Sequence, residues 1–273
     1  MRPPMLVQSP SPEVQVVAFE EGLCTLILNR PERNNALSGS LLEALRVVLE
    51  RVAAAEEARV VVLTGQGEKA FSGGYEIAEL SAEALEAMDT GRIPHPLHLA
   101  TEALARCPVP TLALIRGVAM GGGLDLALAC DIRIAADNAR FCMPPARFGI
   151  LYHYRGIQRF LRAVGPAHTM ELFFTGRQFD AARAREIGLV SHVLPLAAVE
   201  AFTYELAREI AANAPLSVTG TKAIVRRHLE SWPLTAEDEA AMLALIARCA
   251  RSEDLREGTQ ALVERRPGRF VGR

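Results

Sequence analysis

The sequence is poor in lysine, in aromatic residues and in long apolar runs. Lys69 and Lys222 are its only lysines among 273 residues, and aromatic side chains make up 5% of the chain. The net charge of −2 gives no electrostatic reason to expect nucleic acid or an anionic membrane as a partner. No segment approaches the roughly 18 apolar residues that a membrane-spanning helix requires, and the first residues lack an apolar stretch of signal-peptide length. We therefore expect a cytoplasmic protein with neither nucleic acid nor membrane as a partner.

Cysteine and histidine are present without the spacing of a disulfide or metal site. The five cysteines are odd in number, widely spaced and free of any CxxC pair, which opposes a disulfide framework and a zinc site. Their apolar neighbours predict buried thiols that act as small hydrophobic groups. Five of the histidines are scattered, so we expect surface or satisfied core positions for them and no bound metal. These residues are Cys24, Cys107, Cys130, Cys142 and Cys249, and His95, His98, His168, His192 and His228.

Apolar runs separated by glycine and proline divide the chain into alternating strands and helices. Residues 14–29 hold two apolar runs around a short polar turn, which predicts a hairpin. Residues 60–63 and 111–115 are short apolar runs suited to buried parallel strands. The later part of the chain is helical almost throughout. The fold class is therefore α/β, with a core at residues 11–195 and a helical region at residues 196–273 that belongs to the same fold.

Glycine clusters in three segments where a predicted strand gives way to a helix or loop. Glycine has no side chain to block a ligand and accepts dihedral angles that turn N–H groups outward, and a helix N-terminus adds further N–H donors. Two such segments converging on one point would stabilise an oxyanion. Close packing of a helix on a strand is an equally simple explanation of Gly121–Gly123, whereas the pattern around Gly65 lacks the third glycine of a dinucleotide-binding loop. The segments are TGQGEKAFSGGYE (64–76), RGVAMGGGLDLALACD (116–131) and FCMPPARFGILYHYRG (141–156).

These segments and several others resemble the crotonase (enoyl-CoA hydratase/isomerase) superfamily in order and spacing. The resemblance implies a ClpP-like spiral core of ββα repeats and a helical C-terminal trimerisation region. It also implies a homotrimer or hexamer and an acyl-CoA thioester substrate, so that CoA is part of the substrate and no cofactor is needed. The other matching stretches are LNRPERNNALS, FFTGRQFDAARAREIGLVSHVLP, APLSVTGTKA and the ending ERRPGRF.

The resemblance also implies roles for particular residues. The two oxyanion donors would be the backbone N–H groups of Tyr75 and Gly122. Lys222 could meet a CoA phosphate, although a solvated helix surface is the more frequent position of a single lysine. The residues expected to face CoA are Arg33, Ala36, Leu37, Glu76, Ile77 and Ala78.

The residues expected to act on the acyl group differ from those of ordinary hydratases. Hydratases of this family use two glutamates for acid–base catalysis, and this chain has Asp125 at one of these positions and Pro145 at the other. Proline cannot transfer a proton, which puts two-glutamate hydration in doubt. Asp125 would act with a shifted geometry, or it would instead cap the helix that starts near Leu124.

The loop at residues 148–157 resembles the corresponding GxxYxxxGI segment of methylmalonyl-CoA decarboxylases. This resemblance makes Tyr152 the residue nearest the scissile carboxylate, whereas Tyr75 replaces a histidine of those enzymes. His153 and Tyr154 are further candidates for proton transfer. Three functions remain open: a lyase that decarboxylates a malonyl-type CoA ester, a hydratase or isomerase using Asp125, and a non-catalytic acyl-CoA-binding protein.

Overall fold

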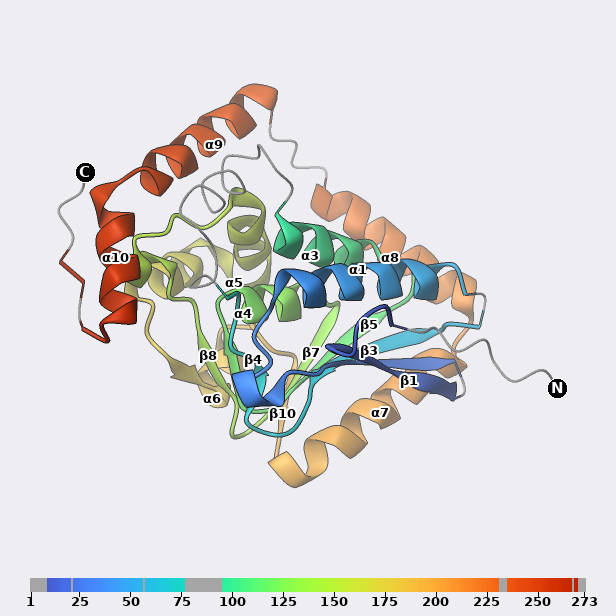
Figure 1. Cartoon of the computed structure of the whole chain (residues 1–273). Helices are drawn as coiled ribbons and strands as arrows, with labels where there is room; N and C mark the ends of the chain where they lie inside the picture. Colours follow the sequence, from blue (N-terminus) through green and yellow to red (C-terminus); the bar gives the residue numbers. More distant parts are fainter. Residues whose placement is uncertain are drawn as a thin grey trace.

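The computed structural model describes residues 9–20, 22–55, 57–76, 95–230, 235–266 and 268–269. Its centre is a six-stranded sheet in which the first two strands are antiparallel and the remaining neighbours are parallel (Figure 1). The strands are, in spatial order, β1 (Val14–Glu20), β2 (Leu23–Leu28), β3 (Val60–Gly65), β5 (Thr111–Ile115), β7 (Ile132–Ala136) and β10 (His192–Leu194). The predicted hairpin is therefore confirmed, and so are the two buried parallel strands.

Strands β3 and β5 are buried on both faces because helices cover both sides of the sheet. Alternate side chains of a strand point to opposite faces, and Val61 and Ala113 belong to the core beneath α1 (Gly39–Ala53) and α3 (Pro96–Arg106). Val62 and Leu112 instead pack with α7 (Leu196–Ala212) on the other face. Figure 1 shows α1 and α3 on one side of the sheet and α7 on the other. Continuous apolar runs are the pattern that such double coverage requires.

A second sheet of four short strands lies beside the first, in the order β4-β6-β8-β9. Its first three members each follow a strand of the large sheet along the chain, so successive turns of the chain contribute one strand to each sheet. Gly117, between β5 and β6, has φ +63°, and a Cβ there would lie 2.0 Å from the Lys69 carbonyl oxygen. This repetition is the expected ββα spiral. The strands are β4 (Ala70–Ser72), β6 (Val118–Met120), β8 (Arg140–Cys142) and β9 (Phe179–Asp180).

Helix boundaries follow capping and backbone breaks. Ser38 is the N-cap of α1 and accepts a hydrogen bond from Leu41 N at 3.0 Å. Gly165, with φ +73°, interrupts α5 just before Pro166, where the second half of the helix begins. The remaining helices are α4 (Gly122–Leu128), α5 (Tyr154–Thr175), α6 (Ala181–Glu186), α8 (Pro215–Glu230), α9 (Ala236–Ala250) and α10 (Glu253–Val263), with 3-10 turns η1 (Pro31–Arg33) and η3 (Pro145–Phe148).

The C-terminal part is helical, as expected, and α8 is fastened to the core by a lysine. Lys222 Nζ lies 2.6 Å from Asp131 Oδ2 and donates to the Val109 carbonyl oxygen at 2.9 Å. Its side chain is 11% exposed, so the expectation of a solvated lysine was wrong. The proposed boundary between residues 195 and 196 stays a prediction.

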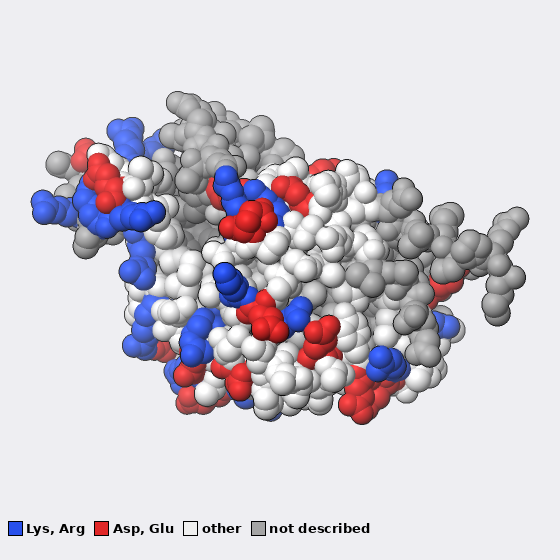
Figure 2. All heavy atoms as spheres, turned by 60° about the horizontal axis from the view of Figure 1, so that its bottom comes forward, with Lys and Arg blue, Asp and Glu red and all other residues white. Residues whose placement is uncertain are grey.

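The cysteines, the surface charges and the helices can each be compared with what the sequence predicts. The four cysteines whose side chains are described are free and buried, which confirms their reading as hydrophobic groups; the side chain of Cys249 lies outside the description. On the face shown in Figure 2, positive and negative side chains are interspersed among uncharged ones. Among the described helices, none is both long enough and apolar enough to cross a membrane.

Candidate active site

A small cavity lies where the three glycine-containing segments meet. It offers about 110 Å³ of space open to water. Its wall is largely apolar, with tyrosine and histidine side chains and several glycines. The described lining residues are Gly73, Gly74, Tyr75, His95, Leu97, His98, Met120, Gly121, Gly122, Pro144, Pro145, Phe148, Ile150, Leu151, Tyr152 and His153. The structure thus brings together three of the four predicted catalytic residues, namely Tyr75, Gly122 and Tyr152.

The backbones of Tyr75 and Gly122 lie side by side in the cavity wall. A Cβ placed on Gly122 would lie 3.5 Å from the Tyr75 nitrogen, and one on Gly74 would lie 3.6 Å from the Gly122 nitrogen. Gly122 is the first residue of α4, so its N–H has no acceptor within the helix. Gly74 has φ +99°, and a Cβ there would lie 2.8 Å from the Met120 carbonyl oxygen. The close approach of the two backbones therefore requires glycine at position 74, whereas a Cβ on Gly122 would meet the end of the Leu97 side chain at 2.9 Å.

The segment predicted to bind CoA runs beside the first of these backbones. Leu37 forms a parallel bridge with Tyr75: its N–H donates to the Gly74 carbonyl oxygen at 2.8 Å, and its own carbonyl oxygen accepts from Glu76 N at 3.2 Å. The Glu76 carboxylate lies 2.6 Å from Arg30 Nη1 and 2.8 Å from Arg33 Nη1. The guanidinium hydrogen bonds lower the pKa of Glu76 although burial opposes them. These contacts hold the loop after β4 against η1.

The six residues predicted to face CoA are described only in part. Leu37 and Glu76 adjoin the cavity segment through the bridge, Arg33 pairs with Glu76, and the Ala36 carbonyl oxygen accepts from Arg30 Nη1 at 2.9 Å. The side chain of Arg33 is 53% exposed. Ile77 and Ala78 lie outside the described residues.

Asp125 lies behind the cavity wall and is completely buried. Arg159 donates hydrogen bonds to both carboxylate oxygens, from Nε to Oδ1 at 2.7 Å and from Nη2 to Oδ2 at 2.8 Å. The Tyr152 hydroxyl donates to Oδ2 at 2.9 Å. Asp125 is thus neither a helix cap, since Gly121 is the N-cap of α4, nor one of the described residues that line the cavity.

Arg159 was not anticipated from the sequence. It lies on α5, where Gly156 allows the Tyr152 ring to rest on the helix: a Cβ on Gly156 would lie 2.3 Å from Tyr152 Cε1. One of many arginines in the chain, Arg159 carries no motif of its own. A completely buried aspartate does imply a cationic partner, but the sequence alone does not say which arginine supplies it.

Three histidines form a series of ring contacts along the cavity wall. The ring centroids of His95 and His98 are 4.5 Å apart, and those of His98 and His153 are 3.9 Å apart. The Tyr75 ring lies 4.9 Å from that of His95. His95 and His98 were expected at surface or satisfied core positions, because only the folded chain brings the distant loop with His153 against the start of α3.

These histidines are held in their neutral form. His95 and His153 are the N-caps of α3 and α5, and each accepts a backbone hydrogen bond at Nδ1, so the neutral ring carries its proton on Nε2. Burial lowers the pKa of His95 to about 4, and burial together with the nearby Arg155 lowers that of His153 to about 4. Burial and the neighbouring cations lower the pKa of His98 more strongly still. Among the described residues, no group of histidine, cysteine and carboxylate side chains has the arrangement of a metal site.

Pro145 occupies the wall where a hydratase glutamate was expected. It is buried at the first position of η3. Helix α10 supports this turn from outside, since a Cβ on Gly149 would lie 2.5 Å from the Asp254 carbonyl oxygen and one on Gly258 would lie 2.3 Å from the Phe148 carbonyl oxygen. The cavity wall and the C-terminal helix therefore pack backbone against backbone.

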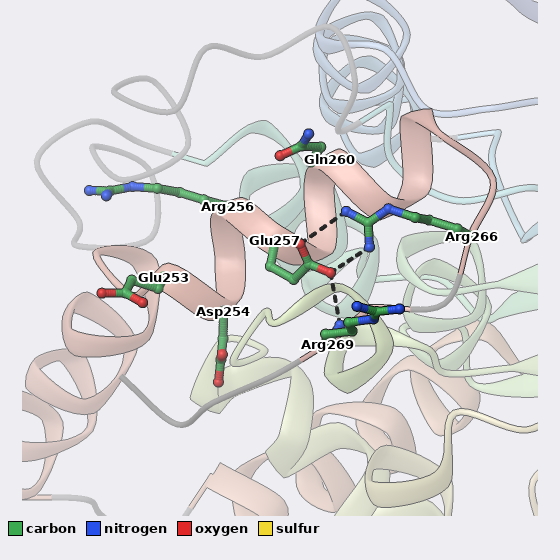
Figure 3. Close-up of a pocket in the computed structure, with 7 residues that line it drawn as sticks. All are labelled: Glu253, Asp254, Arg256, Glu257, Gln260, Arg266 and Arg269. Atoms are coloured by element: carbon green, nitrogen blue, oxygen red, sulfur yellow. Dashed lines mark hydrogen bonds and ion pairs between the residues drawn. The ribbon is translucent and has the colours of Figure 1, made fainter.

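A larger hollow of about 620 Å³ lies along α10, but its chemistry is different. Figure 3 shows that Glu257 points toward Arg266 and Arg269, and its oxygens accept from Arg266 at 2.6 and 3.0 Å and from the Arg269 backbone at 2.8 Å. All its described lining residues are polar or charged, and none lines the cavity at Tyr152. Glu257 and Arg266 pair with each other there, and the hollow is lined by none of the predicted site residues, so the smaller cavity is the candidate active site.

The ββα core and the cavity at its glycine segments define a protein of the crotonase fold class. The family model described as enoyl-CoA hydratase/isomerase matches residues 18–273, and the chain belongs to this family. A short-chain-enoyl-CoA hydratase of Clostridium acetobutylicum is 32% identical over 256 residues, which are 92% of this chain and 95% of that protein.

Solved structures of two kinds resemble this one. A methylmalonyl-CoA decarboxylase in complex with 2-nitronate-propionyl-CoA has a TM-score of 0.89 at 28% identity, covering 96% of this chain and 99% of that chain. An enoyl-CoA hydratase from Bacillus anthracis has a TM-score of 0.75 at 31% identity, covering 96% of this chain and 100% of that chain. These similarities confirm the crotonase superfamily with decarboxylase-like features, and the chain is a crotonase-family acyl-CoA enzyme.

Proposed function

We propose that this enzyme decarboxylates a short malonyl-type CoA ester and stabilises the resulting thioester enolate with the N–H groups of Tyr75 and Gly122. The observation that carries the proposal is the chemistry of the cavity wall. Its described residues include both backbone segments and Tyr152 but no carboxylate, and Asp125 is bound by Arg159 behind them. Decarboxylation needs an oxyanion hole more than it needs a base, which fits this wall.

The proposed reaction is written with the groups of the chain and the substrate and one proton from solvent. The bond between the α carbon and the carboxylate breaks, its electron pair forms the enolate, and CO₂ leaves. The thioester oxygen then carries the negative charge, and each aimed backbone donor contributes roughly 10²–10³ in rate. A proton from solvent at the α carbon completes the acyl-CoA product. Apolar neighbours such as Pro145 and Phe148 disfavour a charged carboxylate before it is lost.

The CoA part of the substrate is proposed to lie along residues 33–37 and the loop after β4. The bridge between Leu37 and Tyr75 supports this, because it places the two predicted contact segments next to each other. That CoA is substrate and that no cofactor or metal is required stay predictions, as does the cytoplasmic location.

Methylmalonyl-CoA is the direct test of the proposal. Release of CO₂ and formation of propionyl-CoA, followed by mass spectrometry, are expected with the purified enzyme. Hydration of crotonyl-CoA at an ordinary enzymatic rate, with no loss of carboxylate from methylmalonyl-CoA, would overturn it. Binding of both esters without any turnover would instead indicate the non-catalytic acyl-CoA-binding protein.

Hydration or isomerisation using Asp125 is the second candidate, and the similarity to enoyl-CoA hydratases favours it. It requires Asp125 to act through Tyr152 or a water chain, because its oxygens are occupied by Arg159 and the Tyr152 hydroxyl. This candidate predicts that hydration of crotonyl-CoA is abolished by Asp125→Asn.

We also propose that the enzyme assembles into a trimer or a hexamer. Large apolar side chains are exposed on α5 and α8, among them Phe174 at 74%, Leu216 at 88% and Ile224 at 61%. Exposed apolar groups of this size are typical of association surfaces. Light scattering on the purified enzyme distinguishes three copies from six or one.

A further inference from the structure

The hydrogen bond between Tyr152 and Asp125 has a direction that bears on the substrate. A phenol has a single proton, and Tyr152 donates it to Asp125 Oδ2 at 2.9 Å. Among the described residues, the other two side-chain hydrogen bonds to the Asp125 carboxylate come from Arg159, at 2.7 Å to Oδ1 and 2.8 Å to Oδ2. The carboxylate is therefore an acceptor in all three bonds, and the tyrosine proton points away from the cavity.

The arrangement is rigid because every member is held elsewhere. Arg159 Nη2 also donates to the hydroxyl of Thr101 at 3.2 Å, and the Arg159 side chain is only 13% exposed. Asp125 is on α4, one turn beyond the proposed oxyanion donor Gly122, and is completely buried. The Tyr152 ring rests against Gly156. Turning the hydroxyl proton toward the cavity would leave a buried carboxylate oxygen with one donor fewer.

We propose that Arg159 and Asp125 are positioning residues that fix the direction of this hydrogen bond, so that Tyr152 meets the acyl group as a hydrogen-bond acceptor alone. This inference rests on the proposed decarboxylation. A phenolic oxygen that can only accept repels a neighbouring carboxylate, which also only accepts. It does not repel CO₂ in the same way, because the carbon of CO₂ is electron-poor. The contact thus disfavours the bound substrate relative to the transition state, which raises kcat and not affinity.

The test compares two CoA thioethers that cannot react, S-(2-carboxypropyl)-CoA and S-propyl-CoA. The double variant Asp125→Leu/Arg159→Met replaces the buried ion pair by apolar groups of similar volume, a change that folded proteins frequently tolerate. The Tyr152 proton is then available to the cavity. The dissociation constant of the carboxypropyl compound should fall about tenfold relative to that of the propyl compound, the effect of one hydrogen bond to a charged group. The kcat for methylmalonyl-CoA should fall while KM falls with it.

Two further variants make the result decisive. Asp131→Leu/Lys222→Met removes the partly exposed ion pair that follows α4 and should leave the ratio of the carboxypropyl to the propyl dissociation constant unchanged. Tyr152→Phe keeps the Asp125–Arg159 pair. It should lower the ratio of the carboxypropyl to the propyl dissociation constant by less than the double variant Asp125→Leu/Arg159→Met does. A ratio that stays constant or rises in the double variant overturns the inference. If that variant does not fold, a rise of the ratio in Tyr152→Phe overturns it, because Tyr152 would then be a donor to the carboxylate.

Different measurements decide the direction of the Tyr152 hydrogen bond and the proposed decarboxylation. Absence of decarboxylation by the unaltered enzyme overturns the proposed function. The ratio of dissociation constants needs no turnover and decides the direction of the Tyr152 hydrogen bond in either case.

Discussion

Two aspartates near helix α4, Asp125 within it and Asp131 just after it, are held by similar groups in different surroundings. Each accepts hydrogen bonds from a hydroxyl and from a cationic side chain: Tyr152 and Arg159 for Asp125, Thr111 and Lys222 for Asp131. Asp125 is completely buried, whereas the Asp131 side chain is 34% exposed.

The difference between them is what the hydroxyl group faces. Tyr152 is part of the cavity wall, whereas Thr111 is a buried residue of strand β5. The same kind of ion pair therefore ties α8 to the core at one place and orients a cavity side chain at the other. An ion pair by itself does not mark an active site; the position of its third partner does.

Replacing each aspartate by alanine should give the largest difference in stability between the two ion pairs. Asp125→Ala leaves the guanidinium of Arg159 buried without a carboxylate and should lower the free energy of unfolding by about 3–5 kcal/mol. Asp131→Ala should cost only about 1–2 kcal/mol, because Lys222 keeps the Val109 carbonyl oxygen and solvent reaches this site. Urea unfolding measures both values. Equal losses would show that the two surroundings do not differ as described.

Substituting a glycine of the cavity wall should lower activity, whereas substituting a glycine of α8 should not. Gly74→Ala adds a Cβ against the Met120 carbonyl oxygen at a φ of +99°, which displaces the Tyr75 N–H and should lower kcat/KM about 100-fold. Gly220→Ala adds a Cβ to the helix of Lys222 where no atom lies within 4 Å. It should leave kcat/KM unchanged and raise stability by about 0.5–1 kcal/mol. Steady-state kinetics and urea unfolding give these values, and a matched loss of activity in both variants would contradict the prediction.

The histidines make the stability of the cavity end dependent on pH. The folded-state pKa of His95 and His153 is lowered from 6.5 to about 4, so the unfolded chain binds more protons between these values. The stability that the two neutral histidines contribute to the folded state is fully present above pH 6.5 and is lost as pH falls toward 4. His95→Asn and His153→Asn keep an N-cap side chain and should flatten this part of the pH profile of the unfolding free energy. Ion-paired carboxylates such as Glu76 act in the same direction below pH 4.5. An unchanged slope from pH 6.5 to 4.5 in the double variant would exclude His95 and His153 as its source, because this variant retains only His98 of the three.

The smallest loss of stability is expected when Lys222, the cation of the Asp131 pair, is replaced. Lys222→Met leaves Asp131 with the backbone and hydroxyl donors of Thr111, so about 1 kcal/mol of stability should be lost. The value of kcat/KM should not change. A loss of affinity for CoA esters in this variant, measured by calorimetry, would instead restore the CoA phosphate contact considered for Lys222.

The sequence was informative where local pattern and backbone geometry decide the structure. Continuous apolar runs predicted the buried strands, and the glycines at positions 74 and 122 predicted two backbones in close approach. The resemblance to crotonases supplied the spiral order of those segments. The comparison with solved structures confirmed this part of the interpretation.

The polar partners of the cavity could not be predicted in the same way. Arg159 and His98 reach the site from helices whose packing depends on the whole fold, and neither has a sequence motif. Asp125 illustrates the limit: the sequence predicted a carboxylate on the helix of Gly122, but which groups surround it depends on α5 and the loop at Tyr152. The roles of Tyr75, Gly122, Asp125 and Tyr152 in catalysis stay predictions.

The contact of α10 with η3 through Gly149 and Gly258 has a consequence for how substrate preference can change. The wall that carries Pro145 and Phe148 is shaped from behind by a helix that contributes no described residue to the cavity. A substitution on α10 that moves this helix by a few tenths of an ångström would move the wall with it. Variation at the C-terminal end of the chain is thus expected to change the shape of the cavity while every described residue that lines it stays the same.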